Sequence, residues 1–259
     1  MCYNNAAGFH DFLTFPRTGC WQGAIRGLEG ESKGMTTKSS LALVHLTQRP
    51  RVRGAGLPPL VLLLHGYGSN EADLFGLAPY LDPRFLIVSA RAPYTLMHGS
   101  YAWFDISWTN SGISIDARQA EASRKLVVDF IGAAAKAYEA DPRQVYLCGF
   151  SQGAILSASV ALTQPELVAG AVLMSGRVPD ELKPLIAPAA RLEHKPFLVV
   201  HGVYDPVLPI QNGRASRAIL EKLPVDLMYK EYPMAHEVSA ESLHDVTSWL
   251  SARLDSSHT

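Results

Sequence analysis

Three residues, Ser151, Asp205 and His236, have the types and spacing needed for nucleophilic catalysis. A serine hydroxyl is a weak nucleophile near neutral pH and needs a base within hydrogen-bond reach, which an acid must hold in one tautomer. A serine activated in this way attacks a carbonyl carbon and forms an acyl-enzyme intermediate. For this chemistry, the surrounding strands and helices must bring the three side chains within hydrogen-bond distance of one another.

Ser151 lies at the centre of Gly149-Phe150-Ser151-Gln152-Gly153. An apolar, β-favouring run precedes this motif and an Ala- and Leu-rich run follows it to about Leu162, which predicts a strand, an abrupt turn and a helix. Glycine on both sides of the turn permits a close approach of strand and helix, and the turn lifts the serine hydroxyl clear of the sheet. The alternative is an ordinary Gly-rich turn with an idle serine.

The predicted acid and base also follow predicted strands. Asp205 comes after the apolar run 197–201, and Pro206 and Pro209 stiffen the turn behind it. The alternative role for Asp205 is to cap a helix that begins near Pro209. His236 is the one histidine of nine that follows Ser151 and Asp205 in a loop between a predicted strand and a predicted helix.

Acyl transfer also needs donors that stabilise the oxyanion. The amide of Gln152, which follows the nucleophile, supplies one donor, and the amide of Tyr67 in the Gly-rich loop 65–68 is predicted to supply the second. Because backbone atoms would make these contacts, the side chains of Tyr67 and Gln152 are predicted to be replaceable.

Composition limits the other function classes. The chain has 259 residues, of which 47% are hydrophobic and 18% are charged, with a formal net charge of -1. No basic surplus indicates a nucleic-acid partner, and no apolar run reaches the length of about 18 residues that predicts membrane insertion. The three cysteines show no framework spacing, so we expect a reducing, cytoplasmic location. A homodimer stays open.

The periodicity predicts one α/β domain over residues 39–256, with a mainly parallel central sheet and helices on both faces. Residues 1–38 show no sustained period of 2 or 3.6 and are predicted to be a disordered or loosely docked extension, with an aromatic flap over the site as the alternative. Strands are expected at 41–47, 60–65, 85–89, 145–148, 169–174, 197–201 and 225–232, and helices at 71–78, 116–138, 152–162, 209–223 and 240–254.

Apolar residues after three different strand ends are predicted to bind the substrate. They are Leu74, Phe75, Trp103, Phe104, Val207 and Leu208. Residues 91–115 form a long, aromatic-rich segment that is predicted to be irregular. No cluster of Arg or Lys accompanies these residues, so an uncharged ester with a short to medium acyl chain is the expected substrate. The alternative is that the aromatic residues are simply core.

Six motifs together resemble the phospholipase/carboxylesterase family of α/β-hydrolases, which includes the acyl-protein thioesterases. They are Leu64–Gly68, Trp103–Asp105, Gly149–Gly153, Leu173–Gly176, His201–Pro209 and Met234–Val238. The order Ser, Asp, His is also that of the α/β-hydrolases. The resemblance implies a serine esterase without metal or organic cofactor, in which Ser151 is the nucleophile, Asp205 the acid and His236 the base, with Tyr67 and Gln152 as oxyanion donors.

Three alternatives to a short-chain carboxylesterase stay open. One is a thioesterase or lysophospholipase that acts on long acyl chains. Another is a non-catalytic α/β-hydrolase used as a binding module, which an intact triad disfavours. A peptidase of related fold usually carries an additional gating domain, for which 259 residues leave no room.

Overall fold

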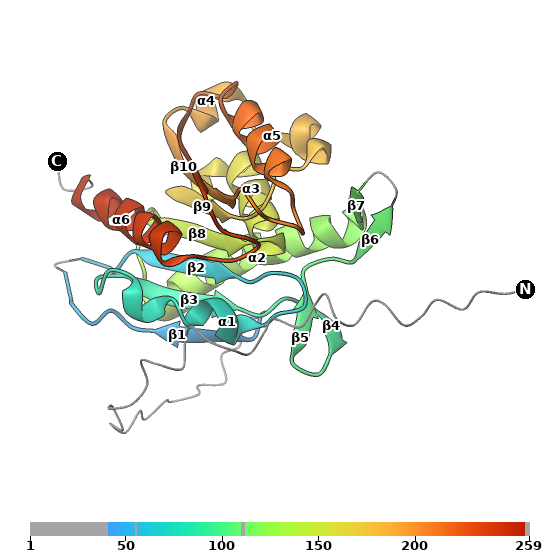
Figure 1. Ribbon diagram of the computed structural model, residues 1–259. Coiled ribbons are helices and arrows are strands. Elements are labelled where there is room, and N and C mark those ends of the chain that lie inside the picture. Colours follow the sequence, from blue (N-terminus) through green and yellow to red (C-terminus); the bar gives the residue numbers. More distant parts are fainter. Residues whose placement is uncertain (1–40, 55, 110–111, 257–259) are drawn as a thin grey trace, which may run out of the picture. The chain divides into compact units, whose positions relative to one another are not determined.

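The computed structural model describes residues 41–54, 56–109 and 112–256. The predicted extension 1–38 lies outside the described residues. The described part contains a seven-stranded sheet with the strand order β1-β3-β2-β8-β9-β10-β11 (Figure 1). All neighbouring strands of this sheet are parallel except the pair β1 and β3. The predicted α/β-hydrolase architecture, a mainly parallel sheet covered by helices, is confirmed.

The elements follow the predicted alternation of strands and helices. The strands of the large sheet are β1 (His45–Gln48), β2 (Leu60–Leu64), β3 (Leu86–Ala90), β8 (Val145–Phe150), β9 (Gly170–Met174), β10 (Lys195–Gly202) and β11 (Val225–Tyr232). The helices are α1 (Glu71–Phe75), α2 (Ala117–Tyr138), α3 (Gln152–Thr163), α4 (Ala189–Leu192), α5 (Ile210–Leu220) and α6 (Ala240–Ser256), with short 3-10 turns η1 (Ala78–Tyr80), η2 (Pro165–Leu167) and η3 (Asp180–Leu185).

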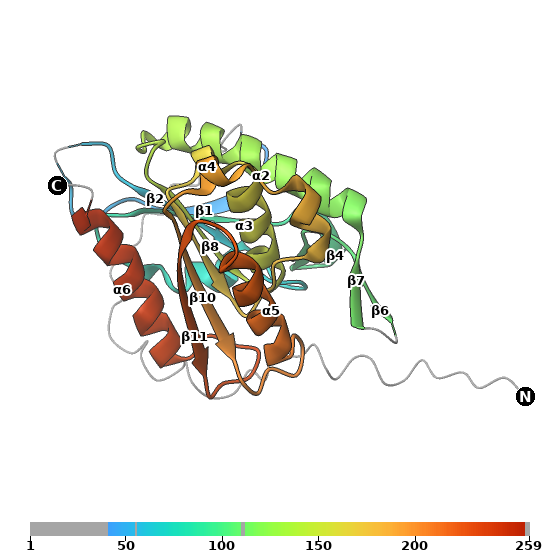
Figure 2. The ribbon, with the colours of Figure 1, turned by 90° about the horizontal axis from the view of Figure 1, so that it is seen from above.

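The sheet separates two apolar cores because successive side chains of a strand point to opposite faces. In β2, Leu60, Leu62 and Leu64 belong to one core, and Val61 and Leu63 belong to the other. The first core includes residues of α2 and α3, and the second includes residues of α1 and α6. Figure 2 shows α6 on one face of the sheet, with α2 and α3 on the other. Burial on both faces explains why the central strands are continuous apolar runs.

The strand order reverses between β2 and β8. From β2 the chain continues outward to β3, whereas from β8 it continues in the opposite direction through β9, β10 and β11. In open α/β sheets a ligand binds outside the carboxyl ends of the strands at such a switch point. The loop that contains Tyr67 follows β2, and Ser151 follows β8, so the topology brings both to this point.

Segment 91–115 is more regular than the sequence analysis predicted. It forms two antiparallel hairpins, β4 (Tyr94–Met97) with β5 (Ser100–Ala102), and β6 (Ile106–Thr109) with β7 (Gly112–Ile115). The first hairpin is tied to the loop after β2, because the Tyr101 N–H donates to the Ser69 carbonyl and the Gly68 N–H donates to the Tyr101 carbonyl. The prediction of an irregular segment is therefore wrong for most of its length.

Candidate active site

The turn that holds Ser151 has a strained backbone. Ser151 has φ 53° and ψ -113°, in a region where a side chain is rarely found. A Cβ atom added at Gly149 would lie 2.2 Å from the Gly153 carbonyl oxygen, and one added at Gly153 would lie 1.9 Å from the Leu64 carbonyl oxygen. Glycine is therefore required at both positions, since any side chain would force α3 away from β2 and β8.

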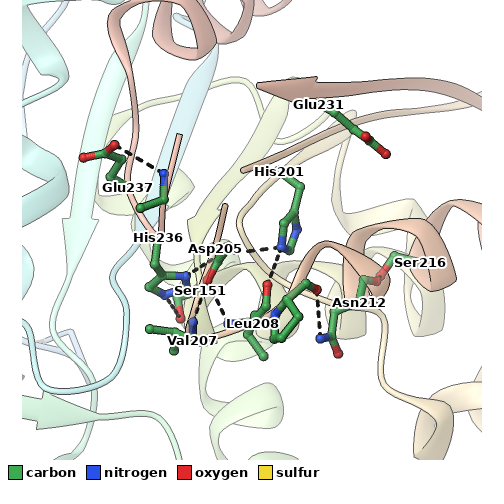
Figure 3. Close-up of polar contacts among 12 residues, drawn as sticks. Ser151, His201, Asp205, Val207, Leu208, Asn212, Ser216, Glu231, His236 and Glu237 are labelled. Carbon is green, nitrogen blue, oxygen red and sulfur yellow. Dashed lines mark hydrogen bonds and ion pairs between the residues drawn. The ribbon is translucent and has the colours of Figure 1, made fainter. Parts of the chain in front are cut away.

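Figure 3 shows His236 between Ser151 and Asp205. The Nδ1 atom of His236 lies 2.7 Å from Asp205 Oδ2, and its Nε2 atom lies 2.9 Å from Ser151 Oγ. A carboxylate only accepts hydrogen bonds, so Nδ1 carries the proton and the lone pair of Nε2 points at the serine hydroxyl. This arrangement can remove the hydroxyl proton as the oxygen attacks a carbonyl carbon.

The Asp205 carboxylate is held rigidly on its other side. Its Oδ1 accepts the N–H groups of Val207 at 2.9 Å and of Leu208 at 2.8 Å, within the turn stiffened by proline. Burial alone would raise the pKa of this carboxyl, but the hydrogen bond and charge of His236 and the two amides outweigh burial and lower it. Asp205 is therefore ionised near neutral pH and can stabilise an imidazolium on His236.

A second histidine approaches the same carboxylate. His201 Nε2 lies 2.7 Å from the Leu208 carbonyl oxygen, to which it donates, and 3.5 Å from Asp205 Oδ2 (Figure 3). Burial lowers the pKa of His201, with the Leu208 carbonyl and the Asp205 charge acting in the opposite direction. A neutral His201 therefore braces the turn that carries Asp205. The approach of His201 to Asp205 was not predicted from the sequence.

The loop after β2 packs directly against the nucleophile. A Cβ atom added at Gly66 would lie 3.3 Å from Ser151 Cβ. The loop is fixed by the hydrogen bonds of the Gly68 N–H to Tyr101 and of the Ser69 N–H to the Gly66 carbonyl. The N–H of Gln152 belongs to the first residue of α3 and has no acceptor one helical turn earlier. Gln152 therefore adjoins Ser151 at the start of α3, and Tyr67 follows Gly66 in the loop that packs against Ser151.

Comparison with known proteins shows the family of the chain. A family model described as phospholipase/carboxylesterase matches residues 55–254 of the chain. The chain belongs to the phospholipase/carboxylesterase family. The match spans every strand of the large sheet except β1, and it includes Tyr67, Ser151, Asp205 and His236.

Relatives from plants and yeast cover most of the same region. A probable carboxylesterase of Oryza sativa subsp. japonica is 29% identical over 212 residues, which is 76% of this chain and 78% of the relative. Acyl-protein thioesterase 1 of Kluyveromyces lactis is 30% identical over 75% of this chain and 92% of its own length. The crystal structure of a Bacillus cereus carboxylesterase shares the fold, with a TM-score of 0.71 and 24% sequence identity. The superposed region covers 83% of this chain and 96% of the Bacillus cereus chain.

The apolar residues predicted to bind substrate do not lie together in this family member. Leu74 of α1 is buried in the core on one face of the sheet, and Phe75 of the same helix packs against that core. Trp103 and Phe104 are 0% and 1% exposed in the core on the other face of the sheet. Val207 and Leu208 adjoin Asp205, and both bind it through their backbone amides.

An apolar groove that the sequence analysis missed runs beside α3. Its volume is about 130 Å³, and its apolar lining consists chiefly of Phe104, Ile115, Ile155, Leu156, Leu182 and Leu185. Ile155, which lines the groove, lies one helical turn after Ser151, and its N–H donates to the Ser151 carbonyl; no side chain of the triad lines the groove. It could not be read from the sequence, because its walls come from β7, α2, α3 and η3.

Two further classes of feature are absent from the described part of the chain. Within residues 41–54, 56–109 and 112–256, no group of three or more His, Cys, Asp or Glu side chains is placed to hold a metal ion. None of the helices in these ranges is long and apolar enough to span a membrane.

Proposed function

We propose that this protein is a serine carboxylesterase for short- to medium-chain esters, with Ser151 as nucleophile, His236 as base and Asp205 as the orienting acid. That it is a carboxylic ester hydrolase follows from its family and from relatives named carboxylesterase. The observation that carries the proposed mechanism is the continuous hydrogen-bonded line from Ser151 Oγ through His236 to Asp205, with links of 2.9 and 2.7 Å.

The reaction follows from the proton positions in this line. His236 Nε2 takes the proton of Ser151 as Oγ attacks the ester carbonyl carbon, and the resulting oxyanion accepts the N–H groups of Tyr67 and Gln152. The imidazolium, stabilised by Asp205, then donates its proton to the departing alcohol. A water molecule, deprotonated by His236, attacks the acyl-enzyme and releases the acid.

The groove beside α3 supports the choice of substrate. Of the six apolar residues predicted to bind substrate, Phe104 lines this groove, and Val207 and Leu208 lie beside Asp205. We assign these three to substrate binding, and Leu74, Phe75 and Trp103, none of which lines the groove, to packing in the two cores. Each methylene that the groove buries is worth about 0.8 kcal/mol, or roughly four-fold in kcat/KM, until the groove is full.

A second candidate function is hydrolysis of long-chain acyl thioesters. It is favoured by the similarity to proteins named acyl-protein thioesterase 1 in Kluyveromyces lactis and Saccharomyces cerevisiae. The small volume of the groove, about 130 Å³, argues for the shorter chain. A binding protein without activity stays a weaker alternative, since one relative from Oryza sativa is named a probable inactive carboxylesterase.

A panel of nitrophenyl esters of increasing acyl length, assayed beside an acyl thioester, tests the proposal. We expect kcat/KM to rise from acetate, to reach a maximum among short to medium chains and then to fall. A monotonic rise to palmitoyl substrates, or a clear preference for the thioester, would favour the second candidate. No turnover of any member would favour the binding protein.

The proposed location is the cytoplasm, and it rests on the sequence. Cys148 is a free, fully buried cysteine, and its burial raises the pKa of its thiol to about 12, so it is inert near neutral pH. Cell fractionation with an antibody against the protein would test the location, and sedimentation would decide between a monomer and a homodimer.

A further inference from the structure

The side chain of Gln152 uses both ends of its amide. It is 3% exposed, its Oε1 accepts the Trp103 N–H at 2.7 Å, and its Nε2 donates to the Phe104 carbonyl at 2.5 Å. If the amide were flipped, its NH₂ would face the Trp103 N–H and its oxygen would face the Phe104 carbonyl, so only the observed orientation makes both hydrogen bonds. The first residue of α3 is therefore fastened by its side chain to the segment that follows β5.

Trp103 extends this connection to the loop after β2. Its indole Nε1–H donates to the His65 carbonyl at 3.0 Å, and its own carbonyl accepts the Ser123 hydroxyl of α2. The Trp103 side chain is fully buried, and its ring lies 5.6 Å from the His65 imidazole. His65 itself precedes Tyr67 by two residues and is held by the Ala92 N–H at 3.0 Å.

These bonds join the two elements that carry the oxyanion donors. The Tyr67 N–H belongs to the loop after β2, and the Gln152 N–H belongs to the start of α3. We infer that the Gln152 side chain and the Trp103 indole form a positioning clamp that sets the separation of the two donors. The inference rests on the proposed esterase function, because it concerns the same oxyanion. It also contradicts our sequence-based prediction that the Gln152 side chain is replaceable.

The clamp matters because oxyanion stabilisation depends on position. Donors must lie about 2.7–3.1 Å from the developing oxyanion, and loss of one donor costs about 10²–10³ in kcat. A displacement of about 1 Å that originates away from the reacting atoms can cost about 10²-fold. Neither clamp side chain touches the substrate in this scheme, so both are positioning residues and their loss should act on the transition state.

The variant Gln152→Met tests the clamp, because methionine has a similar length and can make neither hydrogen bond. The matched control is Gln164→Met at the other end of α3, where the Gln164 Oε1 accepts a hydrogen bond from Arg124 at 2.9 Å. We expect kcat/KM for nitrophenyl acetate to fall about 10²-fold in Gln152→Met, mainly through kcat, and to stay nearly unchanged in the control.

A comparison of the ester with its thionoester separates positioning from general loss of structure. Sulfur is the poorer hydrogen-bond acceptor, so a well-formed oxyanion hole favours the oxygen ester, and that preference should shrink in Gln152→Met. Trp103→Phe, which removes the indole N–H and leaves a smaller ring in its place, should cause a change of the same kind, and it serves if Gln152→Met fails to fold. An unchanged ester-to-thionoester ratio in the folded variants would overturn the clamp.

The outcome for the wild-type protein keeps the two proposals apart. If a fluorophosphonate labels Ser151 of the wild type and the ester is hydrolysed, the proposed function stands whatever the clamp variants do. If the wild type hydrolyses the ester without a preference for oxygen over sulfur, the clamp fails while the esterase remains. If Ser151 is neither labelled nor needed for turnover, the proposed function itself fails, and the clamp fails with it.

Discussion

Replacing Asp205 with asparagine changes the proton arrangement of the site with little change of shape. The two backbone amides of Val207 and Leu208 require an acceptor, so the asparagine Oδ1 should keep their hydrogen bonds. The asparagine NH₂ then faces His236 Nδ1, which must become an acceptor, and the ring proton moves to Nε2. A protonated Nε2 cannot take the Ser151 proton. The same change in a serine-protease triad costs about 10⁴-fold in kcat, which corresponds to about 5.4 kcal/mol at the transition state.

The assay is steady-state hydrolysis of nitrophenyl acetate, with circular dichroism to show that Asp205→Asn is folded. The matched control is Glu237→Gln, which removes an exposed carboxylate next to His236 in the chain; its Oε1 contacts the Ala235 N–H at 3.4 Å. The control should keep nearly all activity, because the Glu237 side chain is exposed and its hydrogen bond is to the Ala235 N–H and not to a side chain of the triad. A loss of only about ten-fold in Asp205→Asn would refute the reasoning and point to another acid.

The remaining predictions concern the triad, acid stability and the first residues of the chain. Ser151→Ala and His236→Ala should each lower kcat by several orders of magnitude, and the double variant should be little worse than either, because the two act as a unit; additive losses in nitrophenyl acetate assays would contradict this. Burial lowers the pKa of His65 and of His201 below the ordinary value of about 6.5. Below about pH 6.5 the unfolded chain therefore binds protons that the folded protein does not, and the free energy of unfolding should fall by at most about 1.4 kcal/mol per pH unit for each histidine. Urea titrations at several pH values would measure this slope; His201→Gln should flatten it, and equal stability from pH 7 to 5.5 would contradict it. Deletion of residues 1–34, which show no periodic apolar face, should leave kcat and Tm nearly unchanged, whereas a large drop in either would show that they belong to the fold.

The fold was predictable because its central strands are unambiguous in the sequence. Runs such as Leu60–Leu64 are apolar at every position, and such a run fits only a strand or a helix that is buried on all sides. The run is short and is flanked by glycine, which favours a strand over a helix. Asparagine is a favoured residue just before a helix, and the Asn70 side chain caps α1 by accepting the Ala72 N–H. Local sequence signals of this kind need no knowledge of distant residues.

The two hairpins of segment 91–115 were missed although one of them has a local signal. Ile106-Ser107-Trp108-Thr109 and Gly112-Ile113-Ser114-Ile115 alternate apolar with polar residues around a short polar turn, which is typical of paired strands. The many aromatic residues of the segment led instead to the prediction of an irregular substrate-binding loop. Strand propensity over only four residues is weak evidence, and pairing partners decide the outcome.

The site divides into a predictable and an unpredictable part. The order of Ser151, Asp205 and His236 is visible in the sequence because each follows a strand that ends at one edge of the sheet. The contacts of the Gln152 side chain are not visible, since its partners lie nearly 50 residues earlier in the chain. The groove beside α3 and the approach of His201 to Asp205 depend in the same way on tertiary packing, which periodicity does not encode.

Reaction with a fluorophosphonate, followed by peptide mass spectrometry, tests the central claim that Ser151 is the activated nucleophile. The proposed mechanism predicts one phosphonyl group per chain, attached to Ser151, with loss of ester hydrolysis in proportion to labelling. Ser151→Ala should take up no label, and His236→Ala should be labelled far more slowly because the base is missing. Full ester turnover in a protein that is unlabelled at Ser151, or labelling at a different residue that abolishes turnover, would contradict the mechanism.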